Sequence, residues 1–80
     1  LYKKGYIMEI DKQIRDSLIL KYQGEVAVAK TNITIYMKNS VGIGEHSDLI
    51  GAIDEQLEKL TTAEEKLSAV QDHFVPDRVI

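Results

Sequence analysis

The residue types best suited to chemistry gather in the segment Gly42 to Asp48. Glu45, His46 and Asp48 place three kinds of metal-binding side chain within four residues. A metal ion needs ligands that converge on one point. The other histidine, His73, falls near the far end of a predicted helix and cannot join them within one chain. We therefore favour a surface turn over a metal site here.

The two glycines of this segment, Gly42 and Gly44, also resemble a phosphate-binding loop. Such loops follow a strand and precede a helix N-terminus, and the P-loop type adds a lysine. A helix is predicted to follow, but no strand is predicted before the loop and no such lysine follows it. We interpret Gly42, Gly44, Glu45 and His46 as a hairpin turn, and we expect no cofactor and no metal.

Catalytic groups are equally scarce. The chain has no cysteine, and none of its serines has a base at a suggestive spacing. The neighbouring carboxylates Glu64 and Glu65 belong to a predicted solvated face, whereas catalytic carboxylates need a tuned environment. A chain of 80 residues is also too short to enclose a typical ligand pocket. We expect no enzymatic activity.

Composition favours a small protein that relies on a partner chain, and the absence of cysteine fits a reducing compartment such as the cytoplasm. Apolar residues make up 44% and charged residues 29%, which is typical of a globular domain. The net charge is −3 and the sequence has no basic stripe that would bind nucleic acid. No apolar run is long enough for a membrane span. Single domains this small are marginally stable, and without cysteine no disulfide can help.

The first residues are expected to lie outside the fold. Leu1-Tyr2-Lys3-Lys4-Gly5 resembles a peptide that recombination-cloning vectors add, and Met8 is the expected natural start. We therefore assign residues 1–7 to a cloning scar or tag, residues 8–74 to a single domain and residues 75–80 to a tail.

The second half of the chain predicts one amphipathic helix over residues 48–74. Its apolar residues recur every three or four positions, with Ala63 filling one gap; they are Ile50, Ile53, Leu57, Leu60, Leu67, Val70 and Phe74. Ser47 is the expected N-cap and Pro76 ends the helix. The stripe drifts from a strict heptad, as a nearly straight helix requires. A possible capping box at Thr62 to Glu65 could break this helix in two. We prefer one continuous helix because the apolar stripe crosses that point unbroken.

The first half predicts a helix over residues 8–38, with a rival interpretation. Apolar residues again step by three or four, at Ile10, Ile14, Leu18, Tyr22, Val26, Ala29, Ile33 and Tyr36. However, residues 25–37 are rich in strand formers, so a β-hairpin that turns at Gln23-Gly24 competes. The helical period continues through Gly24 in phase, and an isolated two-stranded hairpin is marginal in water. We therefore prefer the helix.

The expected fold is all-α: a two-helix antiparallel hairpin, with residues 39–47 as its turn. Several apolar residues of the first helix fall off its main face, so one partner helix cannot cover them; they are Ile19, Leu20, Val28, Ile35 and Met37. A second hairpin could cover these residues, and the two hairpins would then form a four-helix-type bundle. These five residues are our predicted interface of a homodimer or tetramer.

The stretch Asn32 to Asp48, NITIYMKNSVGIGEHSD, resembles a segment of small proteins from marine tailed phages, including those of cyanobacteria. Ser40 and Ser47 stand where that pattern usually has proline, and the resemblance extends over roughly residues 8–73. It implies a helical, phage-encoded protein in the host bacterial cytoplasm. It supplies no catalytic residues, because no activity is assigned to that family.

These observations predict a non-enzymatic structural or interaction protein, and the resemblance implies a phage accessory factor that contacts a phage or host protein. The alternative is a nucleic-acid-associated accessory protein that uses the basic residues of the first helix, Lys12, Arg15, Lys21 and Lys30. Retention on DNA or RNA that weakens with salt would favour the alternative.

Overall fold

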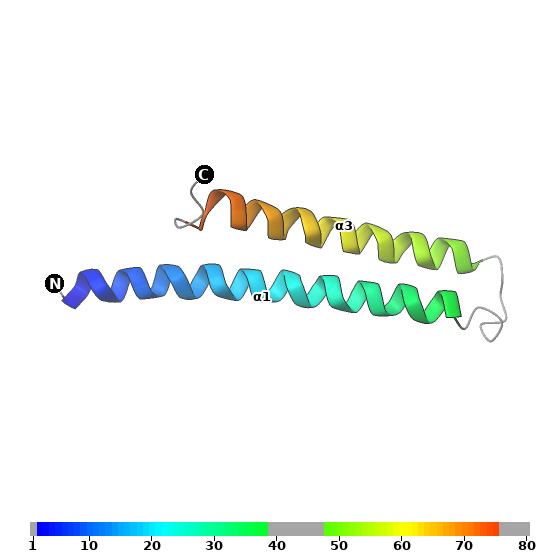
Figure 1. Ribbon diagram of the computed structural model, residues 1–80, viewed down its shortest axis with the longest axis horizontal. Helices are drawn as coiled ribbons and strands as arrows, with labels where there is room; N and C mark the ends of the chain where they lie inside the picture. The colour runs from blue at the N-terminus through cyan, green and yellow to red at the C-terminus, as the bar shows by residue number, and fades with distance from the viewer. Residues whose placement is uncertain (1, 39–47, 76–80) are drawn as a thin grey trace.

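The computed structural model describes the backbone of residues 2–38 and 48–75 and the side chains of residues 10–38 and 48–75. It contains two α-helices, α1 (Tyr2–Lys38) and α3 (Leu49–His73). They lie side by side and antiparallel, and α1 extends beyond the C-terminal end of α3 (Figure 1). The molecule measures 63 × 25 × 15 Å, so it is one helix layer thick.

The hairpin prediction is confirmed for the two helices, and the strand alternative is wrong. Residues 25–37 continue α1 without a break, and the described residues contain no strand. Val26, Ala29 and Ile33 face α3 at helical spacing, so burial against a partner helix outweighs their strand propensity. Gly24 lies within the helix.

The helix ends differ slightly from those expected. Helix α1 begins at Tyr2, six residues before residue 8. The N-cap of α3 is Asp48 rather than Ser47, and its side chain makes no capping hydrogen bond. At the other end the Phe74 N–H donates to the Val70 carbonyl at 2.9 Å, which closes the last turn.

Helix α3 passes unbroken through the Thr61-Thr62 dipeptide, so the capping box does not operate there. The Thr61 hydroxyl donates instead to the Glu58 carbonyl at 3.2 Å. The predicted turn, residues 39–47, lies outside the described residues, together with Gly42, Gly44, Glu45 and His46.

The seam between the helices follows a seven-residue repeat on both sides. Its buried and half-buried members recur every seven positions; they are Arg15, Tyr22, Ala29, Tyr36, Ile19, Val26 and Ile33 on α1, and Leu49, Gln56, Ala63, Val70, Ile53, Leu60 and Leu67 on α3. The heptad therefore holds on α3, contrary to our expectation. The apolar pattern missed it because a polar residue, Gln56, occupies one of the core positions.

Three residues that we placed in the core of α3 are exposed. Ile50, Leu57 and Phe74 expose 74%, 43% and 63% of their surface. On α1, Ile10 and Ile14 are exposed as well. The apolar period indicated two helices correctly, but it could not tell which apolar residues the single partner helix covers.

The shared core is thin. Among the described residues the buried apolar side chains are Ala29, Ala63 and Val70, and no large side chain is fully buried. Small alanines at the centre of the seam let the two backbones approach closely. Neither described helix has a stretch long and apolar enough to cross a membrane.

Candidate interaction surface

Large apolar side chains are exposed along both helices. On α1 they are Ile10, Ile14, Leu20, Val28, Ile35 and Met37, and on α3 they are Ile50 and Leu57, with Phe74 just after its end. Of the predicted interface, Leu20, Val28, Ile35 and Met37 are thus solvent-exposed, whereas Ile19 is half-buried in the seam. Their role in an interface stays a prediction.

The seam has two flanks of different character. One flank is hollowed into an open groove of about 840 Å³. Charged, polar and small residues dominate its lining: Lys21, Gly24, Glu25, Val28, Ala29 and Asn32 from α1, and Glu55, Gln56, Glu58, Lys59 and Thr62 from α3. We call this side the groove flank.

The opposite side, which we call the apolar flank, carries Ile33 and Met37 of α1 and Ile50, Ile53 and Leu57 of α3. A helix turns by about 100° per residue, so Ile50, Ile53 and Leu57 fall within about 60° of one another. By the same rule Met37 points about 180° away from Val28, which lines the groove. Ile33 and Ile53 are half-buried, while Met37 is 63% exposed.

A polar pair joins the helices at the groove. The Asn32 side-chain Nδ2 donates to Gln56 Oε1 at 3.1 Å, and Gln56 is only 9% exposed. Burying an amide without a partner is costly, so each side chain offsets the burial of the other. Periodicity alone missed Gln56 because glutamine is not apolar; its place seven residues before Ala63 was the available signal.

The groove flank also carries an ion pair, formed by Lys21 and Glu25. The Lys21 ammonium donates a hydrogen bond to the Glu25 carboxylate, one turn later on α1. That bond lowers the pKa of Glu25 and raises the pKa of Lys21. The ring centroid of Tyr22 lies 5.6 Å from Lys21 Nζ and 5.7 Å from Lys66 Nζ. Cations at that distance are weakly attracted to the ring.

The basic residues considered for nucleic-acid binding are mostly paired within α1. Lys12 contacts Asp16 at 2.8 Å and Arg15 contacts Asp11 at 3.6 Å, each one turn away. Lys21 is paired with Glu25 in the same way. These pairs reduce the local positive charge, which weakens the attraction of a phosphate backbone.

The metal alternative at the turn is not tested, because Glu45 and His46 lie outside the described residues. Asp48 is described and exposed. In the ranges that the structure describes, no group of three or more histidines and carboxylates is placed to hold a metal ion.

Comparison with known proteins identifies no relative. No protein-family model matches the chain, and no curated protein or solved structure shows significant similarity to it.

Proposed function

We propose that this chain is a non-catalytic interaction protein whose hairpins associate with one another to form a helical bundle. The observation that carries the proposal is the single-layer architecture, 15 Å thick, with large apolar side chains exposed on it. A helix with an apolar stripe is stable when a second layer covers it, and domains are usually built from two layers.

The exposed area supports the same proposal. The chain exposes 6558 Å², whereas a compact monomer of this mass is expected to expose about 4,900 Å². The excess is roughly twice the 800 Å² that each partner buries in a standard interface. A standard interface with one further copy of the hairpin would therefore remove about half of this excess.

Nothing in the described residues favours the nucleic-acid alternative, since three of its four basic residues have carboxylates beside them. The resemblance to small phage proteins remains a prediction, and the proposal does not depend on it. The phage or host partner and the cytoplasmic location also remain predictions.

Sedimentation equilibrium over a wide concentration range tests the proposal, with far-UV circular dichroism confirming that the sample is helical. We expect a mass of two or four chains, each of 9.0 kDa. Thermal unfolding should also shift upward with protein concentration, because association stabilises the folded state by mass action. A helical monomer at the highest concentration would refute self-association.

A further inference from the structure

We propose that two copies of the hairpin pack apolar flank on apolar flank around a two-fold axis parallel to the helices. The C-terminal ends of both α1 helices then lie at the same end of the dimer, and each α1 packs on the α3 of the other copy. This inference rests on the self-association proposed above and specifies its geometry.

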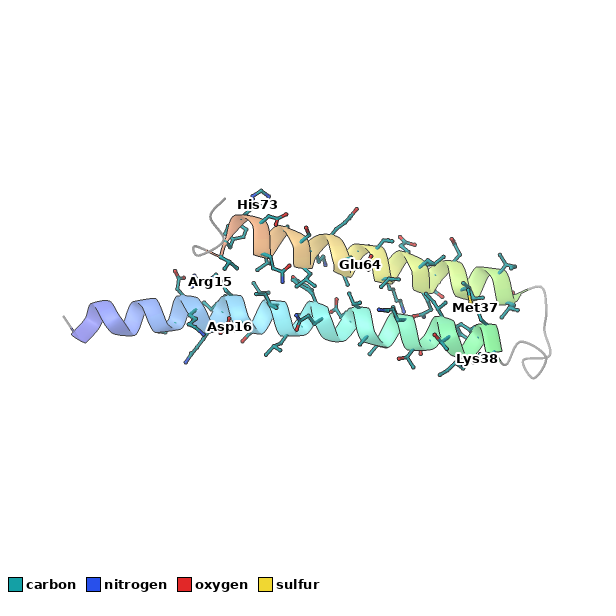
Figure 2. All side chains as sticks on the ribbon, in the orientation of Figure 1. Arg15, Asp16, Met37, Lys38, Glu64 and His73 are labelled. Atoms are coloured by element: carbon teal, nitrogen blue, oxygen red, sulfur yellow. The ribbon has the colours of Figure 1, made fainter. Side chains whose placement is uncertain are left out.

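The apolar flank is not uniform along its length. On α3 the outer positions recur every seven residues, and they change from Ile50 and Leu57 to Glu64 and Gln71. Figure 2 shows Met37 beside the start of α3, with Glu64 farther along that helix. The apolar part of the flank is therefore confined to the half near Met37.

Helix α1 shows the same change. Stepping back from Met37 by sevens gives Lys30, Gln23 and Asp16, all of them exposed and polar. Asp16 lies toward the N-terminal half of α1, well away from Met37 (Figure 2). Both helices thus become polar on this flank in the same direction.

This asymmetry separates the two symmetric ways of stacking the flanks. A two-fold axis parallel to the helices superposes the apolar half of one copy on the apolar half of the other. An axis perpendicular to the helices, with full overlap, places Ile50 and Leu57 against the half that carries Glu64. That arrangement would desolvate a charge without pairing it, which is costly.

Charge complementarity gives a second, independent argument. Without residues 1–7, which we expect to be a cloning scar or tag, helix α1 carries five basic and four acidic residues, hence +1, and α3 carries two basic and six acidic residues, hence −4. With the parallel axis each α1 stacks on an α3 of opposite charge. With the perpendicular axis α1 stacks on α1 and α3 on α3, which brings like charges together. Complementary charge selects between such arrangements.

The dimensions fit this bundle. Helices pack with their axes about 8–10 Å apart. A second layer at that spacing raises the 15 Å thickness of the hairpin to about 25 Å, which equals its 25 Å width. The result has the square cross-section of a four-helix bundle.

Double electron–electron resonance on the spin-labelled full chain tests the geometry. The chain has no cysteine of its own, so an introduced cysteine is the single labelling site. Two single-cysteine variants, Lys38→Cys and Gln13→Cys, each receive a nitroxide label at an exposed position on α1. With the parallel axis both label pairs should show a short distance, set by the spacing of about 14 Å between diagonal helix axes. With the perpendicular axis both pairs should be separated by a further 35 Å or so along the helices.

Two results would overturn the geometry. Long distances at both positions would show the perpendicular axis, and a short distance at residue 38 with a long one at residue 13 would show staggered antiparallel halves. In either case a mass of two chains would leave self-association standing, whereas a monomeric mass would refute the proposed function itself.

A matched pair of variants locates the contact. Ile50→Ser and Leu20→Ser each remove a similarly exposed side chain, 74% and 68%, and Leu20 lies about 25 Å along α1 from Met37, in the half of α1 where this flank is polar. We expect Ile50→Ser to raise the dissociation constant at least about tenfold and Leu20→Ser to change it little. Equal effects, or a larger effect at Leu20, would contradict packing on the apolar flank.

Discussion

The side-chain amide of Asn32 donates a hydrogen bond to the side-chain carbonyl of Gln56, 24 residues later in the chain, over 3.1 Å. Both residues occupy or border the heptad seam, where apolar side chains are the rule. A slide of one helix along the other would separate the two amides and leave Gln56 buried without a partner. The pair therefore favours one register of the hairpin over others that bury similar apolar area.

A double-mutant cycle on this pair should show direct coupling. Asn32→Ala and Gln56→Ala are each expected to lower the free energy of unfolding, and the coupling between them should be about 1 kcal/mol. Urea denaturation of the four proteins at one protein concentration measures it. The control cycle combines Asn32→Ala with Gln71→Ala, and the effects of these two substitutions should add to within about 0.5 kcal/mol. A coupling equal to that of the control would mean that the hydrogen bond does not operate in solution.

The close approach of the helices predicts that added volume at the seam is costly. Ala63 is 1% exposed, so Ala63→Leu should lower the free energy of unfolding by about 1–3 kcal/mol through overpacking. Ala69, six residues later on the same helix, is exposed, and Ala69→Leu should be neutral within about 0.5 kcal/mol. Chemical denaturation at matched concentrations compares them. If the two variants were equally stable, the seam would be looser than the structure shows.

The sequence predicted the two helices well because their apolar residues keep one period throughout. It predicted α3 to within a residue at each end, and it identified Tyr22, Ala29 and Ala63 as core residues. It failed where the choice depends on a neighbour. Ile50 and Leu57 have the composition of core residues, and only the position of α1 shows that they lie outside the seam.

The predicted interface shows the same limit. Helical spacing identified Leu20, Val28 and Met37 as residues that one partner helix cannot cover, and all three are exposed. Spacing could not show that Val28 lines a groove with charged walls while Met37 lies on the opposite, apolar flank. That distinction depends on which residues α3 brings beside each of them.

The Lys21–Glu25 pair predicts a pH dependence that the variant Lys21→Gln should remove in part. The hydrogen bond from Lys21 holds the pKa of Glu25 below its ordinary 4.5, so removing the ammonium should raise that pKa. A carboxyl with a depressed pKa contributes stability above its ordinary pKa and loses it as pH falls through the folded value. A carbon-13 NMR titration of Glu25 measures the change, with Lys30→Gln as the control. An unchanged Glu25 titration in Lys21→Gln would show that the pair is not formed.

The same pair has an alkaline limb. Glu25 raises the pKa of Lys21 above 10.5, so its contribution is present below that pH and fades as pH rises through the folded pKa. Because both side chains are exposed, the effect on overall stability should be small and should weaken with salt.

Gly24 offers a prediction that bears on stability and on the packing of the two copies. It lies in the middle of α1 on the groove flank, and an added Cβ would meet nothing within 4 Å. Gly24→Ala should therefore stabilise the protein by up to about 1 kcal/mol through helix propensity. Gly51→Ala, equally open but in the first turn of α3, should give a smaller gain. Thermal unfolding at fixed concentration measures both. If the second copy instead packed closely on the groove flank, the new methyl group would clash there, and Gly24→Ala would lower both the melting temperature and the tendency to associate.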